Sequence, residues 1–431
     1  MVTFRNTALG RSMLFSTLAK LSGAAIPFAG LPIIAHSLPA SAYATFLKAM
    51  TIASLSTSFF GAASIVAIRD IARARASGSK AAVGDAESST LGLYIVVSTV
   101  SIITAAVLLM GQARGTAVLM AIASIIVVTQ GLAQWGDAHR VGSRTDHISS
   151  LWQLSSSLAL ISAIVSARPR NPLGAILIYF GIPAIFQVLM AAQLILRDQL
   201  RTRPTFNLAW AILQLRGIAP VLVNFATEYI KIFGSGTLIL FVSGRASYSM
   251  FLTLILLGAR LVNPISLIAR PLMPAYVDAV AANDQQWLSG MVKILSIMLF
   301  CGAIVALTVY GVLQPSTLDV FLPPTAPRPS FIDIGFLMLF IWGHAGTALL
   351  APIFFAGGKA ALFSTINLVL VCVGLSFGNL LFDAGMPWGI LAGLSVGTSC
   401  VALFAWAFTV AHRGRFPEGK LIQAAASRSA F

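Results

Sequence analysis

Ionisable side chains stand inside apolar stretches of this sequence, where a charge is costly. Glu228 and Lys231 are three residues apart in the apolar stretch 217–242, so on a helix they share a face and can neutralise each other. Glu228 is also the one carboxylate that the sequence places deep in such a stretch. Two readings follow and stay open: a structural ion pair, or an acidic coupling site for a proton or a sodium ion at Glu228.

Further cations lie in other apolar stretches. Lys20 and Arg260 have no acid nearby in their own stretches, which favours a place on the wall of a polar cavity. Lys48 lies near the end of its stretch and fits either a cavity or the membrane surface. Arg270 and Lys293 are close enough to the ends to reach the headgroups. Lys20, Lys48, Lys231 and Arg260 together predict a cationic cavity for an anionic substrate.

Motifs of nucleotide, metal or nucleophilic chemistry are missing from the sequence. It contains no G-x-x-x-x-G-K-[ST] phosphate-binding loop. The five histidines are not spaced as metal ligands would be. His344 is expected to pack inside the tenth apolar stretch, with a proton site as the alternative. The other four are expected to be solvated at helix ends (His36, His139, His147 and His412). Cys301, Cys372 and Cys400 lie in apolar stretches and are expected to be small core residues. We therefore expect no enzyme activity, no metal and no cofactor.

Composition places the chain in a membrane. Of its 431 residues, 58% are hydrophobic and only 10% are charged, and the mean hydropathy is +0.89, whereas soluble domains carry about 25% charged residues. The net charge of +15 comes from Lys and Arg in short segments between apolar stretches, as membrane topology requires. Nucleic-acid binding is therefore not expected, and the lipid bilayer is the expected surrounding.

The apolar stretches are long enough for twelve membrane-spanning helices, at roughly 20 residues each. This predicts an all-α polytopic membrane protein with two parallel six-helix bundles, 1–196 and 217–431, joined by a linker at 197–216 that contains a possible interfacial helix. The expected spans are 13–36, 43–68, 89–110, 115–135, 148–167, 173–196, 217–242, 249–276, 289–313, 331–356, 360–381 and 388–411. Loops of about twenty residues are expected at 69–88 and 197–216, and short ones elsewhere.

The distribution of Lys and Arg predicts the orientation. The stretch FFGAASIVAIRDIARAR, residues 59–75, ends an apolar run in a basic exit that is typical of the cytoplasmic side. With both termini cytoplasmic, seventeen Lys and Arg fall on that side and five on the other. Arg69 is therefore interpreted as an orienting and interfacial residue, as is Arg270, rather than as a substrate ligand.

The two halves resemble each other. SAYATFL (Ser41–Leu47) and ASYSMFL (Ala246–Leu252) share a Tyr-x-x-Phe-Leu pattern and open the second and eighth expected spans. Prolines and small residues such as Gly234–Ser235–Gly236 interrupt spans 1, 7 and 8, which also carry the buried cations. Interrupted helices in a membrane are tolerated where they line a cavity or pack on protein.

The residues IIAHSLPASAYATFL, followed by FFGAASIVAIRDIA, resemble the opening of the Wzx-type polysaccharide flippases, which belong to the multidrug/oligosaccharidyl-lipid/polysaccharide exporter superfamily. Gly61 to Arg69 and Tyr43–Phe46 occupy the places of the family motif, and Ala42 departs from it where a glycine is frequent. The resemblance implies a MATE-like fold. It also implies a bacterial inner-membrane flippase for surface polysaccharide such as the O-antigen of lipopolysaccharide.

In this family the substrate is an undecaprenyl-pyrophosphate-linked oligosaccharide that moves from the cytoplasmic to the external leaflet. The resemblance implies that Lys20, Lys231 and Arg260 meet the pyrophosphate, and that glycan polymerase or ligase machinery is a partner. A MATE-like drug or cation exporter is the main alternative, and the excess of buried cations over carboxylates argues against it. An O-antigen polymerase or ligase would need a larger external loop. A major facilitator transporter would carry Gly-x-x-x-Asp-Arg-x-Gly-Arg-Arg after its second span, and this motif is absent. A lipid II flippase would have more helices than the twelve expected here.

Overall fold

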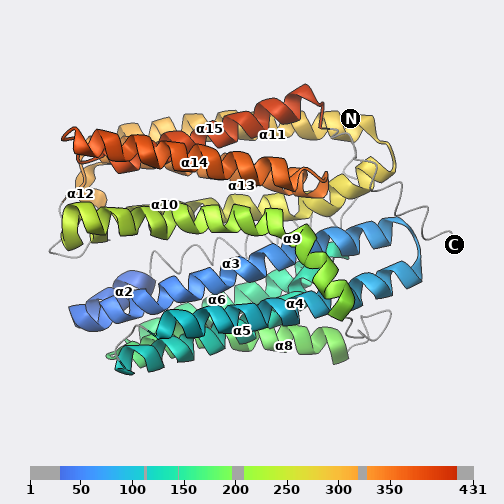
Figure 1. Cartoon of the computed structure of the whole chain (residues 1–431), viewed down its shortest axis with the longest axis horizontal. Coiled ribbons are helices and arrows are strands. Elements are labelled where there is room, and N and C mark those ends of the chain that lie inside the picture. The colour runs from blue at the N-terminus through green and yellow to red at the C-terminus, as the bar shows by residue number, and fades with distance from the viewer. Residues whose placement is uncertain (1–29, 111–113, 144, 197–207, 319–327, 415–431) are drawn as a thin grey trace.

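The computed structural model describes residues 30–110, 114–143, 145–196, 208–318 and 328–414, and within them the protein is helical without strands. The helices run roughly along one direction and form two layers (Figure 1). In the N-terminal half they are α2 (Leu31–Ser37), α3 (Ala40–Ala76), α4 (Lys80–Leu109), α5 (Arg114–Gly142), α6 (Asp146–Ala167), α7 (Pro172–Ile176) and α8 (Ile182–Leu196). In the C-terminal half they are α9 (Leu208–Tyr229), α10 (Ser235–Ala281), α11 (Gln285–Val312), α12 (Pro315–Leu318), α13 (Phe331–Ala356), α14 (Ala360–Asp383) and α15 (Gly389–Ala411).

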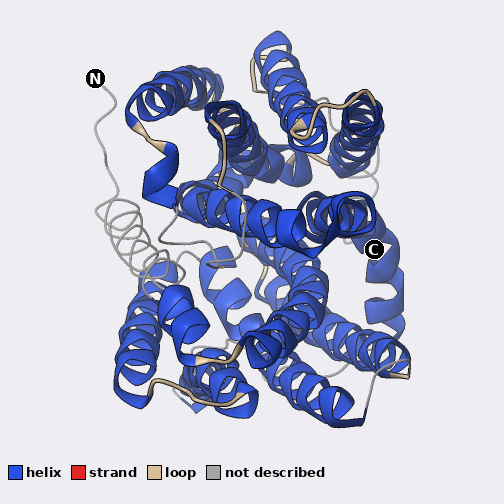
Figure 2. Ribbon diagram, turned by 90° about the vertical axis from the view of Figure 1, so that its left-hand side faces the viewer, coloured by secondary structure: helices blue, strands red, loops and turns tan. Residues whose placement is uncertain are grey.

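Each half packs as a bundle. In the first, α3 packs on α4 and α5, and α8 packs on α5 and α6. In the second, α15 packs on α13 and α14, and α13 on α10 and α11. Seen along the helices, the two bundles lie one above the other, with the C-terminal bundle in the upper half of the view (Figure 2). Contacts of α3 with α9 and α10, and of α4 with α9, join them.

Glycines let two helices of the C-terminal bundle approach closely. A Cβ added at Gly378 on α14 would lie 2.7 Å from the carbonyl oxygen of Gly389 on α15. A Cβ at Gly389 would lie 2.6 Å from the carbonyl oxygen of Gly378. Such backbone contacts between small residues are a main source of helix association where lipid replaces water. They hold α14 against α15, and α14 carries one residue of the site described below.

Eight helical segments of the described chain are long and apolar enough to cross a membrane, and they coincide with expected spans 3–6 and 9–12. Residues 1–29 lie outside the described part, so most of the first expected span does too. The second span corresponds to α3. The seventh and eighth correspond to α9, α10 and the short segment between them.

Three expectations about loops are wrong. The expected loop at 69–88 is a short turn at 77–79, because α3 continues to Ala76 and α4 begins at Lys80. The expected break at 243–248 is helical, since α10 runs unbroken over Ser235–Ala281 and so holds residues for more than one crossing. Residues 208–216 open α9 rather than form a separate interfacial helix. Polar residues extend helices beyond the hydrocarbon, and hydropathy marks only the part in lipid.

The helices are irregular at two places. Five residues, Leu177–Gly181, form a π-helical segment η2 just before Pro183, and Ile230–Gly234 form a second one, η3, between α9 and α10. Pro220 lies inside α9 without ending it. A π segment inserts an extra residue per turn and often marks a functional position. The segment η3 contains Lys231 and begins two residues after Glu228.

The three cysteines do not lie in the core. Cys301, Cys372 and Cys400 are exposed on α11, α14 and α15. These helices are long and apolar enough to cross a membrane, so an exposed position on them would face lipid rather than water. Sequence alone cannot separate a lipid-facing position from a core position, because both are apolar.

Candidate ion site in the C-terminal bundle

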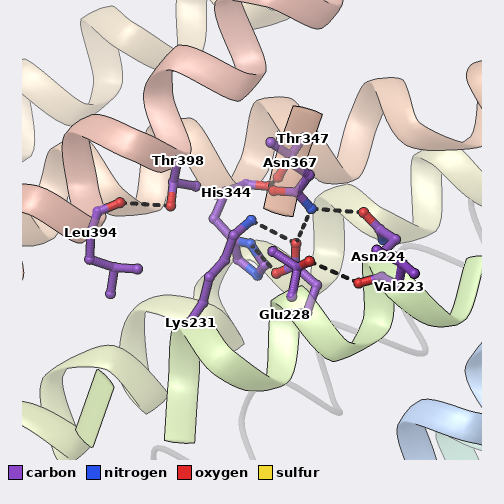
Figure 3. Close-up of polar contacts among 10 residues, drawn as sticks. Val223, Asn224, Glu228, Lys231, His344, Thr347, Asn367, Leu394 and Thr398 are labelled. Carbon is purple, nitrogen blue, oxygen red and sulfur yellow. Dashed lines mark hydrogen bonds and ion pairs between the residues drawn. The ribbon is translucent and has the colours of Figure 1, made fainter. Parts of the chain in front are cut away.

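The candidate site is a cluster of polar side chains inside the C-terminal bundle (Figure 3). Asn224, Glu228 and Lys231 come from α9 and η3, and their spacing of four and then three residues puts them on one helix face. His344 comes from α13 and Asn367 from α14. Three separate segments therefore converge on one carboxylate.

The Glu228 carboxylate is the centre of the cluster. Its Oε1 accepts hydrogen bonds from Lys231 Nζ at 2.7 Å and from Asn367 Nδ2 at 3.2 Å. Its Oε2 lies 3.2 Å from His344 Nδ1. Asn367 Nδ2 also donates to Asn224 Oδ1 at 2.7 Å. Every group that the structure places on this carboxylate carries a nitrogen donor, and one of them, the lysine, is a cation.

Burial is deepest at the lysine. Lys231 and Asn367 are 0% exposed, whereas the side chains of Glu228 and His344 keep 21% and 14% exposure. The His344 ring also stacks on Phe340, with ring centroids 5.5 Å apart. A buried ammonium beside a partly accessible carboxylate is stable only as a pair, since an unpaired buried charge is strongly destabilising. The accessible side of the pair is the carboxylate and imidazole side.

Some hydrogen-bonding capacity at the site is unused. Glu228 Oε2 and His344 Nδ1 make no hydrogen bond, although they lie 3.2 Å apart, and Asn367 Oδ1 has no partner. Buried polar groups are normally satisfied, so unused ones call for an explanation. An added proton on the carboxylate would supply an O–H donor where the structure now holds only acceptors and nitrogen donors. The coupling of Glu228 to a proton stays a prediction, and these unused atoms are where an added donor would bind.

The structure places some of the site residues predicted from the sequence and leaves others undescribed. The structure brings Glu228 and Lys231 together. Lys20 lies outside the described residues. Lys48 lies on α3, and Arg260 and Arg270 lie on α10, at positions whose side chains the structure does not describe. The cationic cavity therefore stays a prediction at Lys20, Lys48 and Arg260, as does the interfacial role of Arg270, and Lys231 is the cavity member whose surroundings the structure describes.

Arg69 is half-buried and its Nε donates to Asp70 Oδ1 at 2.8 Å. Both residues belong to α3, so this ion pair holds the side chain on its own helix. The assignment of Arg69 to topology rather than to substrate binding stays a prediction. The two arginines that follow it on α3 behave differently, as described below.

A second polar cluster lies in the N-terminal bundle, and it corrects two expectations. His139, expected to be solvated, is 4% exposed, and its Nε2 lies 2.8 Å from Glu87 Oε1. Arg140, one of the seventeen Lys and Arg assigned to cytoplasmic segments, lies on α5, is 0% exposed and donates to Gln193 Oε1 at 2.9 Å. Glu87 is also buried, so Glu228 is not the only carboxylate inside a helix bundle. These residues were misplaced because α4 and α5 are longer than their apolar centres.

Sequence reasoning overlooked the two asparagines and underrated His344. Asn224 lies one helical turn before Glu228, and a polar amide at that spacing in an apolar stretch was a usable signal. Asn367 and His344 carry no such signal, because their partner is more than a hundred residues away in the chain. Only the packing of α14 against α9, and the contact of His344 on α13 with Glu228, bring them to the carboxylate.

Comparison with known proteins gives the fold. No family model matches the chain, and no curated protein matches it. Solved structures do: a mutant of the Vibrio cholerae MATE transporter VcmN has a TM-score of 0.74 at 13% identity, covering 95% of this chain and 97% of that one. An outward-facing multidrug resistance MATE family transporter of the MOP superfamily has a TM-score of 0.74 at 14% identity over 94% and 95% of the two chains. The eukaryotic MATE transporter AtDTX14 gives 0.67 at 16% identity over 94% and 96%.

These likenesses cover nearly the whole chain. The protein therefore has the fold of the MATE transporters, a fold of multi-pass membrane proteins built from two helix bundles. This confirms the predicted all-α, MATE-like architecture. At this level of identity the comparison shows the fold, and the transported substrate has to be argued from the residues.

Proposed function

We propose that the protein is a membrane transporter that flips an undecaprenyl-pyrophosphate-linked oligosaccharide from the cytoplasmic to the external leaflet of a bacterial inner membrane. The two bundles would open alternately to either side, and the termini would be cytoplasmic. The MATE transporter fold supports transport as the activity. The resemblance of the first two spans to Wzx-type flippases supports the substrate class.

The observation that carries the choice of an anionic substrate is the compensation of Glu228. A cationic drug needs a carboxylate that is free to pair with it. Glu228 already pairs with the Lys231 ammonium at 2.7 Å and lies 3.2 Å from His344. The cations predicted at Lys20, Lys48 and Arg260 have no such partner in their own stretches. The resulting excess of cations over free carboxylates favours a phosphate-bearing substrate.

The physics of the substrate requires such a protein. A glycan cannot cross hydrocarbon unaided, because each unpaired hydroxyl costs roughly 2–7 kcal/mol on transfer. A polar path between the bundles would carry the glycan and pyrophosphate while the lipid tail stays in the bilayer. Phosphate oxygens bind Arg and Lys through charge-assisted hydrogen bonds, which are about twice as strong as neutral ones.

The second element of the proposal is that Glu228 couples this movement to a proton. The groups around the carboxylate are an ammonium, an amide N–H and an imidazole nitrogen. Sodium prefers oxygen ligands, and a neighbouring ammonium repels it. A proton on Glu228 would instead remove the charge that holds Lys231, which would change the contacts of α9 with Asn367 on α14 and with His344 on α13.

The experiment that tests the substrate uses cells in which the gene is deleted and then replaced by variants. Deletion should leave lipid-linked glycan in the inner leaflet, and wild type should restore the surface glycan. Arg260→Ala should reduce restoration about tenfold or more, and Arg260→Lys should retain part of it. Lys293→Ala is the matched control, because Lys293 is exposed on α11 and should restore fully. Normal surface glycan in the deletion strain would refute the flippase proposal.

A multidrug or cation exporter is the second candidate, favoured by the fold shared with a multidrug resistance MATE transporter. The same deletion strain separates the two. Increased drug sensitivity with normal surface glycan would support the exporter, and Glu228→Gln should then abolish resistance. Loss of surface glycan without a change in drug sensitivity would support the flippase.

A further inference from the structure

The two bundles are not equally separated along their length. One large hydrophobic cluster contains residues from both, among them Phe60 and Trp135 of the N-terminal bundle and Tyr276 and Phe354 of the C-terminal bundle. The next three clusters each stay within one bundle. The shared cluster lies toward the end where α3 turns into α4, on the right in Figure 1. We call this end the latch end.

Arginines of α3 join the two bundles at the latch end. Arg75, in the last turn of α3, donates from one guanidinium nitrogen to both carboxylate oxygens of Asp278 on α10, at 3.0 and 3.2 Å. Arg73 donates to the backbone carbonyl of Ala356 at 2.9 Å. These partners are more than two hundred residues away in the chain, so the contacts exist only while the bundles are together at this end.

The acceptors suit these arginines for different reasons. Ala356 is the last residue of α13, and the final carbonyls of a helix lack intrahelical donors and carry the negative end of the helix dipole. Asp278 lies one turn before the end of α10 and supplies a full negative charge. Arg75 and Asp278 keep 26% and 32% exposure, so water can replace each partner when the pair separates.

We propose that Arg73 and Arg75 of α3, with Asp278 of α10 and the C-terminus of α13, form a latch that holds the transporter closed at this end and releases during transport. The inference rests on alternating opening of the bundles, which is part of the proposed function. An exposed ion pair biases an equilibrium without locking it. A transporter needs such a reversible contact, because each transport cycle must break the contact and form it again.

The distance across the latch end tests the proposal. The three cysteines are replaced by alanine, and spin labels are attached at Ala76→Cys and Ala282→Cys, two exposed positions that flank the ion pair. Double electron–electron resonance on the full chain in lipid nanodiscs then gives the distance distribution. In otherwise unchanged protein a short distance should dominate. Arg75→Ala should lower the ratio of short to long distances by about fivefold, the effect of roughly 1 kcal/mol.

Charge reversal makes the test specific. Arg75→Asp and Asp278→Arg alone should each lower the ratio further, since each places like charges together. The double variant R75D/D278R should restore it to near the starting value. Arg170→Ala, which removes an exposed arginine from the turn between α6 and α7, is the matched control and should leave the distances unchanged. Monodisperse elution in size-exclusion chromatography checks that each variant folds.

Unchanged distances in all three single variants, or a double variant no better than the singles, would overturn the latch. Failure of the flippase proposal would give a different combination of distances and surface glycan. If the distances respond as expected but the protein restores no surface glycan, the latch stands and the flippase proposal fails. If glycan is restored while the distances never respond, the latch fails alone.

Discussion

Replacing Lys231 by methionine gives the sharpest test of the buried cluster. Methionine keeps the length of the side chain and removes its charge. Lys231 is 0% exposed and its Nζ lies 2.7 Å from Glu228 Oε1, so the change leaves a carboxylate inside the bundle without its closest cation. Breaking a buried pair by removing one partner costs about 3–5 kcal/mol. His344, 3.2 Å from the other oxygen, compensates in part, and we expect about 3 kcal/mol.

The double variant separates the pair from the packing of its members. Glu228→Gln alone leaves the lysine ammonium buried with only an amide oxygen, so it should also destabilise. In K231M/E228Q both charges are gone, and the loss should be smaller than the sum of the two single losses by about 1–3 kcal/mol. Asn367 can still donate to the new amide oxygen in this double variant.

Thermal unfolding of purified protein in nanodiscs measures the effect. A change of 1 kcal/mol shifts the midpoint of domains of 150–250 residues by about 2–4 °C, and by less in longer chains. For this chain we expect Lys231→Met to lower the midpoint by roughly 3–6 °C. Lys293→Met is the control, because Lys293 is exposed on α11 and its loss should be neutral. A Lys231→Met midpoint equal to wild type, or a double variant no more stable than the sum predicts, would refute the pairing argument.

Other parts of the structure give further predictions. Glu87→Gln should destabilise the N-terminal bundle by about 1–3 kcal/mol, since it weakens the buried contact with His139 at 2.8 Å; thermal unfolding measures it, and an unchanged midpoint would contradict the burial. Gly378→Leu should cost at least about 1–3 kcal/mol because its Cβ would lie 2.7 Å from a backbone oxygen of α15; Gly290→Leu, with open space around it, should not. The exposed cysteines should resist a water-soluble maleimide while the protein is in the membrane, because the reactive thiolate does not form in lipid, and should react after unfolding in denaturant; labelling in the membrane would show that their helix faces are not in lipid (Cys301, Cys372 and Cys400).

Much of the helical architecture could be predicted, because hydrocarbon imposes one simple rule on the chain. A spanning helix needs a continuous apolar stretch of a set length, and eight of the expected stretches are found as such helices. The ends could not be predicted in the same way. Leaving the membrane does not end a helix, and α3 continues through Arg69, Arg73 and Arg75 to Ala76. The basic exit, interpreted as a loop, is helix, and this places its arginines beside α10 and α13.

The candidate site was predictable only where its contacts are local. Glu228 and Lys231 are neighbours on one helix face, so their spacing alone indicates a pair. His344 and Asn367 meet Glu228 through the packing of separate helices, and no spacing encodes that. His139 shows the same limit in the opposite direction. Its position near the end of a helix suggested solvent, whereas Glu87, fifty-two residues earlier in the chain, provides a buried partner.

The placement of charge favours bundles that move as units. Within the bundles, two carboxylates have close partners, Lys231 for Glu228 and His139 for Glu87. Separating such pairs inside a bundle would expose charge to a low-dielectric interior at a cost of several kcal/mol. Between the bundles, α3 contributes the ion pair of Arg75 with Asp278, which is partly exposed to water, and the hydrogen bond of Arg73 to the Ala356 carbonyl, and separating a partly exposed ion pair costs little. The path of least cost is therefore a rigid-body movement of one bundle against the other.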